Sequence, residues 1–170
     1  MDRQNVTLAL GHAASGKSAW AEAEVRRIGG DRVYVATAQL WDEEMRAKAV
    51  AHARARGPDW HVIEEPIELA ATCRTAKAGQ IWLVDCATMW LTNIVLADAP
   101  WEGPAADWID AMADSPAKFV VVSNDVGGGI TPDNALARRF QTAQGRLNQR
   151  LAHAAGRVVL VTAGLPQVLK

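Results

Sequence analysis

Residues 11–18, Gly-His-Ala-Ala-Ser-Gly-Lys-Ser, carry the clearest chemical signal, because they fit the pattern Gly-x4-Gly-Lys-Ser/Thr. In such a loop the glycines let the backbone curl so that consecutive N–H groups point at phosphate oxygens. The lysine reaches the β- and γ-phosphates, and the hydroxyl binds magnesium. An apolar run precedes the loop and a periodic run follows it, a context that disfavours the alternative of a chance glycine-rich turn. We therefore predict that Lys17 and Ser18 handle a nucleoside triphosphate and its magnesium ion.

A carboxylate at the tip of a neighbouring strand completes such a site, since it holds the magnesium ion directly or through water. Asp85 ends the apolar run 81–84 and fits this role. Capping of a helix that begins near Thr88 is the plainer interpretation of Asp85. Asp125 is a weaker rival, because it follows the apolar run 119–123 in a similar way but precedes a run of three glycines.

A histidine within a predicted helix is the candidate nucleophile. Lys48, His52 and Arg56 lie four residues apart in the helix predicted over 42–56, so they share one face. Three potentially cationic groups together favour an anion, and neutral imidazole is a competent nucleophile near pH 7. A solvated face on which Glu44 pairs with Lys48 is the alternative, and spacing alone favours it. The remaining histidines have no adjacent partner in the sequence: His12, His61 and His153.

Short β-branched runs alternate with longer periodic runs along the chain. Strands are predicted at 5–10, 32–36, 60–64, 81–85, 119–123 and 157–162, and helices at 17–28, 42–56, 66–76, 88–96, 104–113 and 132–155. Continuous apolar strands between helices imply a mostly parallel sheet covered on both faces. We therefore predict a single α/β domain, residues 1–170, with the three-layer P-loop NTPase fold.

The helix over 132–155 is the best defined of these. Thr131 is its predicted cap, Pro132 suits its first position, and Gly156 ends it. Its predicted buried stripe repeats every three or four residues: Leu136, Phe140, Ala143, Leu147, Leu151 and Ala154.

Composition excludes several classes of protein. The 170 residues are 49% hydrophobic and 22% charged, which is ordinary for a globular protein. A net charge of −1 supplies no basic field to hold nucleic acid. Cys73 and Cys86 lack metal-ligand spacing and are expected to be reduced thiols. The first residues lack the apolar region of a signal peptide, and no run approaches the roughly 18 apolar residues of a membrane span. We expect a soluble, cytoplasmic protein without a membrane span.

Several segments together with the phosphate loop resemble the bifunctional adenosylcobinamide kinase / adenosylcobinamide-phosphate guanylyltransferase of cobalamin synthesis. The resemblance covers nearly the whole chain. A phosphate loop is shared by many families, whereas the combination of Ala-Thr-Ala-Gln, the Asp-Glu-Glu-Met segment and Gly-Arg-Leu-Asn-Gln-Arg-Leu is far more specific. The matching segments are Tyr34–Gln39, Asp42–Met45 with His52 and Trp60 downstream, Val84–Asn93, Val122–Gly127, Pro132–Phe140, Gly145–Leu151 and Ala163–Pro166.

The resemblance implies two reactions. A nucleoside triphosphate, ATP or GTP, phosphorylates the aminopropanol hydroxyl of adenosylcobinamide. GTP then guanylylates an enzyme histidine with loss of pyrophosphate, and adenosylcobinamide phosphate takes the GMP to give adenosylcobinamide-GDP. The resemblance also implies a homotrimer with nucleotide sites near the subunit interfaces.

The family's guanylylated histidine falls on His52, and its GTP contacts fall on the phosphate loop and on four further segments. These positions are Gly11, His12, Ala13, Ala14, Ser15, Gly16, Lys17, Ser18, Ala36, Thr37, Ala38, Ala53, Arg54, Ala55, Arg56, Glu64 and Asp85. The loop departs from the family's usual Gly-Gly-Ala-Arg-Ser, because His12 replaces a permissive glycine and Ala14 replaces a cation.

Two other functional classes stay open at this point. One is a generic small-molecule or nucleotide kinase in which His52 is structural. The other is a nucleotide-dependent switch without turnover, against which the absence of the guanine-reading motif Asn-Lys-x-Asp weighs.

Overall fold

The computed structural model describes residues 5–39 and 42–170. Within this part of the chain, seven strands form one sheet in the order β3-β2-β4-β5-β1-β6-β7. All neighbouring strands pair in parallel except β6 and β7, which are antiparallel. The strands are β1 (Val6–Gly11), β2 (Asp31–Ala36), β3 (His61–Glu64), β4 (Gln80–Asp85), β5 (Lys118–Asn124), β6 (Arg157–Thr162) and β7 (Leu165–Val168).

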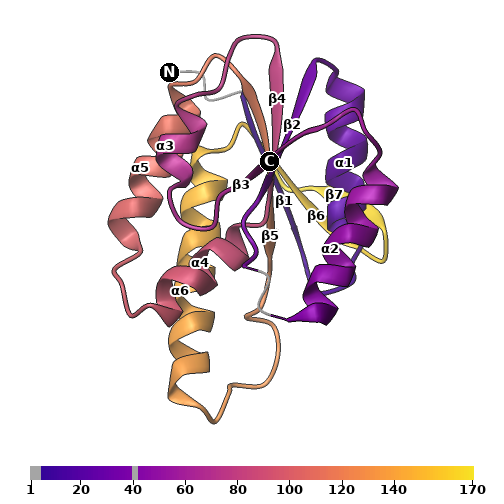
Figure 1. The fold of residues 1–170 in the computed structure, drawn as a ribbon. Coiled ribbons are helices and arrows are strands. Elements are labelled where there is room, and N and C mark those ends of the chain that lie inside the picture. Colours follow the sequence, from indigo (N-terminus) through magenta and orange to yellow (C-terminus); the bar gives the residue numbers. More distant parts are fainter. Residues whose placement is uncertain (1–4, 40–41) are drawn as a thin grey trace.

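Helices cover both faces of this sheet, as Figure 1 shows with the sheet seen nearly edge-on between them. One face carries α1 (Lys17–Ile28) and α2 (Glu43–Arg56). The other face carries α3 (Leu69–Cys73), α4 (Ala87–Leu96), α5 (Glu102–Ala113) and α6 (Ala135–Ala154). The predicted three-layer α/β fold with a mostly parallel sheet is therefore confirmed. None of the described helices is long and apolar enough to cross a bilayer.

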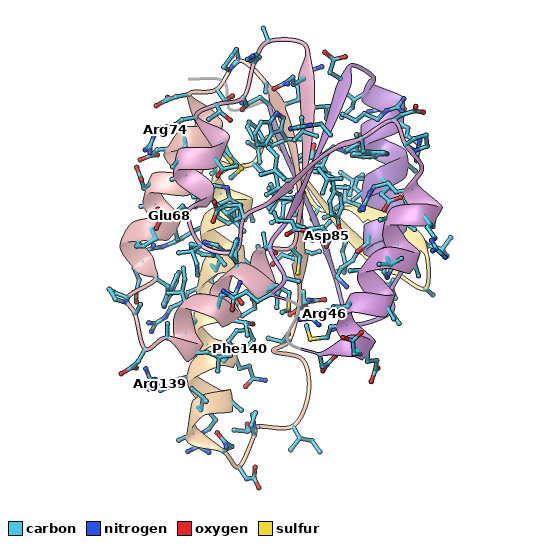
Figure 2. The ribbon with its side chains drawn as sticks, in the orientation of Figure 1. Arg46, Glu68, Arg74, Asp85, Arg139 and Phe140 are labelled. Carbon is cyan, nitrogen blue, oxygen red and sulfur yellow. The ribbon has the colours of Figure 1, made fainter. Side chains whose placement is uncertain are left out.

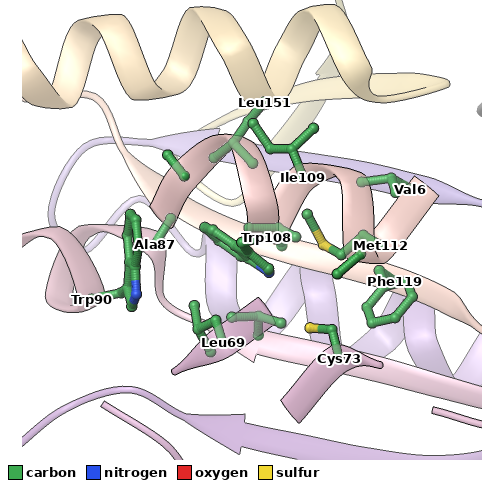
Figure 3. Packing of buried hydrophobic residues seen from close by; sticks show 14 of the residues in the cluster. Val6, Leu69, Cys73, Ala87, Trp90, Trp108, Ile109, Met112, Phe119 and Leu151 are labelled. Atoms are coloured by element: carbon green, nitrogen blue, oxygen red, sulfur yellow. The ribbon is translucent and has the colours of Figure 1, made fainter. Parts of the chain in front are cut away.

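The central strands are mostly apolar because they contribute to a separate core on each face. In β4, Trp82 and Val84 belong to the cluster beneath α3–α6, whereas Ile81 and Leu83 belong to the cluster beneath α1. Strand residues alternate between faces, so a strand buried on both sides has few positions at which a polar side chain would reach water. Figure 3 shows the larger cluster, in which the rings of Trp90 and Trp108 lie 5.2 Å apart between their centroids.

The β-strand registers gather polar residues at one edge of the sheet. Ala36 pairs with both Glu64 and Asp85, and Gly11 pairs with Asn124, each at the carboxyl end of its strand. After β1 the chain enters α1 on one face, and after β5 it reaches α6 on the other face. This divergence is the topological switch point at which open α/β sheets bind ligands.

The helix predicted over 132–155 is shorter than expected. It begins at Ala135, because the side chain of Asn134 accepts a hydrogen bond from the Ala137 N–H at 3.1 Å and serves as the cap that we assigned to Thr131. Leu136, assigned to the buried stripe, is 44% exposed, whereas Leu147 and Leu151 are fully buried. The buried stripe therefore lies in the second half of the helix.

Two further elements differ from the prediction. The helix predicted over 66–76 spans only Leu69–Cys73, because the Glu65 carboxylate accepts the N–H groups of Ile67 and Glu68 and forms a turn there. Strand β7 was not predicted. It follows a two-residue turn, Ala163–Gly164, in which both residues have positive φ, 52° and 77°.

The turn between α1 and β2 depends on close backbone packing at Gly30. This residue has φ +106°, and a Cβ there would lie 2.4 Å from the Gly79 carbonyl oxygen. We expect Gly30→Ala to lower the free energy of unfolding by roughly 1–3 kcal/mol, as measured by denaturant unfolding. Gly145→Ala, on the exposed face of α6 with no atom within 4 Å of the new Cβ, is the control and should be neutral or mildly stabilising. Equal stability of both variants would contradict this packing.

Candidate active site

The phosphate loop folds as the sequence predicts. Strand β1 ends at Gly11, and Gly16, with φ 91°, precedes the first residue of α1, Lys17. A Cβ on Gly11 would lie 2.3 Å from the Ser15 Oγ and 2.7 Å from the Val161 carbonyl oxygen, so only glycine fits there. No side chain of the described residues caps α1, which leaves the first N–H groups of this helix for phosphate oxygens.

Lys17 closes the loop from its carboxyl side. Its ammonium Nζ donates a hydrogen bond to the His12 carbonyl oxygen at 3.1 Å, and the residue is only 9% exposed. The lysine therefore lies across the loop, with its charge held where phosphate groups would bind. Ser18 follows in the first turn of α1 and is half-buried.

His12 and Ala14, the two loop residues that depart from the family pattern, are exposed, and so is Ala13 between them. The His12 Nδ1–H donates to the Asp125 carbonyl oxygen at 2.8 Å, and the Asp125 N–H donates to the Gly11 carbonyl oxygen at 3.1 Å. Ala14 adopts φ 56°. The His12 side chain thus ties the phosphate loop to the segment after β5. Asp125, the rival carboxylate, is an exposed residue whose backbone makes both of these bonds.

Asp85 lies at the carboxyl end of β4, and in Figure 2 its label is near the middle of the molecule, between α2 and α4. The Tyr34 hydroxyl donates to its Oδ2 at 3.1 Å. Burial raises the pKa of the Asp85 carboxyl, while the Tyr34 hydrogen bond and the charges of Lys17, His52 and Arg56 lower it. These three basic side chains come from α1 and α2, so the sheet edge brings the phosphate loop, the carboxylate and the histidine helix into electrostatic contact.

Two side chains of this site carry oxygen atoms of the kind that magnesium prefers. Magnesium is usually held by one or two protein oxygens together with substrate phosphates and water. Ser18 offers a hydroxyl and Asp85 a buried carboxylate. No group of three or more His, Cys, Asp or Glu side chains suited to a metal occurs among the described residues.

The face shared by Lys48, His52 and Arg56 is not a continuous exposed cationic stripe. His52 is exposed, as are Ala53, Arg54 and Ala55, but Arg56 is only 6% exposed. Its guanidinium carbon lies 3.3 Å from the ring centroid of Tyr34. Its Nη1 is buried without a hydrogen-bond partner among the described residues. The side chain of Lys48 lies outside the described part of the chain.

The segment Ala36–Ala38 reaches the same edge, but the Thr37 side chain has a structural role. Its hydroxyl donates to the Cys86 carbonyl oxygen and accepts from the Cys86 N–H, both at 2.7 Å, and the residue is fully buried. The Thr37 N–H also donates to the Asp85 carbonyl oxygen at 3.3 Å, so both the hydroxyl and the backbone N–H of this residue are used within the protein. Glu64, at the end of β3, is exposed beside Ala36.

The cysteine thiols do not compete with the histidine as nucleophiles. Both are free and buried. Burial raises the pKa of Cys73 to about 12 and that of Cys86 to about 11, so each thiol stays protonated near neutral pH.

Two residues of this site were not predicted from the sequence. Tyr34 touches both Asp85 and Arg56. Its position two residues before Ala36 places it on the same face of a strand, and it begins the family-like segment Tyr34–Gln39, but neither feature indicated these contacts. Asn93 is buried in α4 and donates through its amide to the carbonyl oxygens of Thr37 and Pro66 at 2.8 and 3.1 Å. It fixes the path of the chain after β2, and its spacing gave no signal of this role.

Comparison with known proteins identifies the relatives of this chain. The family described as cobinamide kinase / cobinamide phosphate guanyltransferase matches residues 7–169. The bifunctional adenosylcobalamin biosynthesis protein CobP of Pseudomonas aeruginosa is 41% identical over 166 residues, which cover 96% of each chain. The corresponding CobU protein of Salmonella typhimurium is 37% identical over 96% of this chain and 98% of its own.

Solved structures with low sequence identity share the fold alone. The flagellar accessory protein FlaH of Methanocaldococcus jannaschii superimposes with a TM-score of 0.54 at 11% identity, over 98% of this chain and 78% of its own. A protein of Pyrococcus horikoshii OT3 superimposes with a TM-score of 0.56 at 10% identity, over 98% of this chain and 86% of its own.

The buried charge of Asp85 leads to a prediction about stability. The pKa of Asp85 is higher in the folded protein than in the unfolded chain. Ionisation of Asp85 therefore lowers the stability of the fold as the pH rises through the folded-state pKa. Below the unfolded-state pKa this cost is absent. We expect Asp85→Asn to raise the melting temperature at pH 7–8 in nucleotide-free EDTA buffer, with a gain that disappears on acidification. The exposed Asp125→Asn is the control and should show no such gain. A lower melting temperature for Asp85→Asn at pH 8 would contradict the unfavourable burial of this charge.

Proposed function

The chain belongs to the cobinamide kinase / cobinamide phosphate guanyltransferase family, and on that premise we propose that it catalyses both reactions in cobalamin biosynthesis. It phosphorylates adenosylcobinamide with ATP or GTP. It then transfers GMP from GTP, through a guanylyl-histidine at His52, to adenosylcobinamide phosphate. The observation that carries this proposal is the convergence of Lys17, Asp85 and the His52 helix at one edge of the sheet.

Phosphoryl transfer depends mainly on positioning and charge stabilisation. The backbone N–H groups of the loop and of the first turn of α1 hold the β- and γ-phosphates, with Lys17 across them. The aminopropanol hydroxyl of the corrinoid attacks the γ-phosphorus, the bond to the β-phosphate oxygen breaks, and the hydroxyl proton is released. This step requires no covalent intermediate and no histidine.

Guanylyl transfer takes place in two displacements. A nitrogen of the neutral His52 imidazole attacks the α-phosphorus of GTP, and the bond to pyrophosphate breaks. An oxygen of the corrinoid phosphate then attacks the same phosphorus, the P–N bond breaks, and the imidazole is restored. His52 is exposed, so a large substrate can reach the intermediate after pyrophosphate has left. Such covalent catalysis divides one difficult step into two easier ones.

Magnesium is part of the proposal, with the Ser18 hydroxyl and the Asp85 carboxylate as its protein ligands. When bound, the ion would neutralise charge on the phosphates and on the departing group. The Arg56 Nη1 group, buried without a partner among the described residues, is a donor for a nucleotide oxygen. Backbone groups of Ala36–Ala38 and the Glu64 carboxylate are further candidate nucleotide contacts.

We extend the proposal to the assembly and the cellular location. Family resemblance supports a homotrimer with nucleotide sites near its interfaces, and the exposure of Ala53–Ala55 on α2 is compatible with a neighbouring subunit there. The two free cysteines agree with a reducing, cytoplasmic environment. The substrates are small molecules, and a net charge of −1 does not favour nucleic acid as a partner.

The proposed intermediate is tested by incubating the protein with GTP and magnesium and measuring its mass. We expect one added GMP, mapped to His52, that is labile in acid and stable in alkali, as for a phosphoramidate. His52→Ala should lose guanylylation while retaining kinase activity, since the kinase step needs no histidine. Label from the α-phosphate of GTP on His52→Ala, or an adduct on another peptide, would overturn the assignment.

The shared use of the phosphate loop leads to a second test. Lys17→Ala should abolish phosphoryl transfer and weaken triphosphate binding sharply, because Lys17 is the cation held across the loop. Kinase turnover and equilibrium binding of ATP and GTP measure this directly. The surface variant Lys77→Ala, in the turn before β4, is the control and should bind both nucleotides normally. Near wild-type kinase turnover in Lys17→Ala would remove the loop from the active site.

A further inference from the structure

Helix α2 carries His52, yet it makes little use of apolar packing. Among its described side chains, Arg56 alone is buried, Met45 and Ala49 are half-buried, and the others are exposed. Globular helices are ordinarily held by an apolar stripe that faces the core. The position of His52 must therefore depend strongly on what holds Arg56, the last residue of the helix.

Arg56 is held by aromatic and cationic groups of three other segments. Its guanidinium lies 3.3 Å from the ring centroid of Tyr34, in β2. The Trp60 ring packs edge-on to Tyr34 with centroids 6.3 Å apart, and the Arg26 guanidinium lies 5.7 Å from the Trp60 ring. Arg26, in α1, also donates through its Nη2 to the Arg56 carbonyl oxygen at 2.7 Å. We call these four residues, Arg26, Tyr34, Arg56 and Trp60, the Arg56 anchor.

The anchor acts on His52 through the helix itself. His52 precedes Arg56 by four residues, which is about one helical turn and roughly 6 Å along the axis. A shift of Arg56 therefore moves the imidazole, and misplacement of a nucleophile by roughly 1 Å can cost about a hundredfold in rate. Tyr34 is the one member of the anchor that also bonds Asp85, through its hydroxyl at 3.1 Å.

We propose that Tyr34 is a positioning residue for guanylyl transfer: its ring face holds Arg56 and thereby places His52 against the α-phosphate of GTP. The inference rests on the proposed function of His52. The ring and the hydroxyl of Tyr34 have separate tasks. The ring holds the histidine helix and serves guanylyl transfer, whereas the hydroxyl orients Asp85 and serves both reactions.

Two substitutions separate these tasks. Tyr34→Phe keeps the ring and deletes the hydroxyl, so it is the matched control for Tyr34→Leu, which deletes both. We expect Tyr34→Leu to guanylylate His52 roughly tenfold more slowly than Tyr34→Phe, because a desolvated cation–π contact is worth about that factor. The two variants should have similar kinase turnover. The proposal would be overturned if the two variants were guanylylated at equal rates. It would also be overturned if Tyr34→Leu lost guanylylation and kinase activity equally relative to Tyr34→Phe.

Hydrogen exchange of the backbone amides gives a readout that does not depend on catalysis. Amides of α2 should exchange roughly tenfold faster in Tyr34→Leu than in Tyr34→Phe, with those of α5, on the other face of the sheet, unchanged. Should Tyr34→Leu unfold as a whole, Arg26→Gln, on the exposed surface of α1, tests the same anchor from its other side and should also accelerate exchange in α2. If the wild-type protein acquires no GMP, the proposed role of His52 is refuted. If Tyr34→Leu and Arg26→Gln are guanylylated at the normal rate and the amides of α2 exchange no faster in them, the Arg56 anchor alone is refuted.

Discussion

The packing of the phosphate loop against the ends of β5 and β6 is the contact on which the rest of the site depends. The loop is held from both sides: the Gly164 N–H donates to the Ser15 carbonyl oxygen at 2.8 Å, and the Asp125 N–H donates to the Gly11 carbonyl oxygen at 3.1 Å. No Cβ fits on Gly11. These bonds set the curl of the backbone before α1 begins, and so set the direction of the N–H groups that we propose as the phosphate donors. The antiparallel pair β6–β7 supplies Gly164 from its turn, which gives the last strand of the fold a direct function.

Around this loop the fold accepts an unfavourable charge for chemical reasons. Asp85 is buried at a strand end, where burial raises the pKa of its carboxyl. Lys17, Arg56 and the Tyr34 hydroxyl reduce that cost without removing it. A carboxylate in a water-poor site attracts a bound metal ion strongly. The buried carboxylate therefore lowers the stability of the nucleotide-free protein, and we propose that it serves phosphoryl and guanylyl transfer.

Much of this account could be predicted from the sequence, because the features concerned are local. The phosphate loop, Asp85 at a strand end and the alternation of strands with helices depend on residues that are neighbours in the chain. The features that were missed depend on contacts between distant segments. Arg56 faces Tyr34 instead of solvent because β2 passes beneath the end of α2, and no spacing within residues 42–56 encodes that. The short β7 is exposed along its whole length, and it follows the turn in which Ala163 and Gly164 have positive φ. Thr37 resembles a ligand contact in sequence, yet its hydroxyl is satisfied by Cys86, 49 residues away.

The central claim is that one phosphate loop serves both reactions, with His52 added to it by α2. The most direct measurement is inhibition by a triphosphate analogue in which neither the α,β-bridge nor the β,γ-bridge can be cleaved, assayed in parallel against phosphoryl transfer to adenosylcobinamide and against formation of the guanylylated enzyme. A single loop predicts competitive inhibition of both reactions with the same inhibition constant. Full inhibition of phosphoryl transfer with guanylylation unaffected would mean two separate triphosphate sites and would contradict the account.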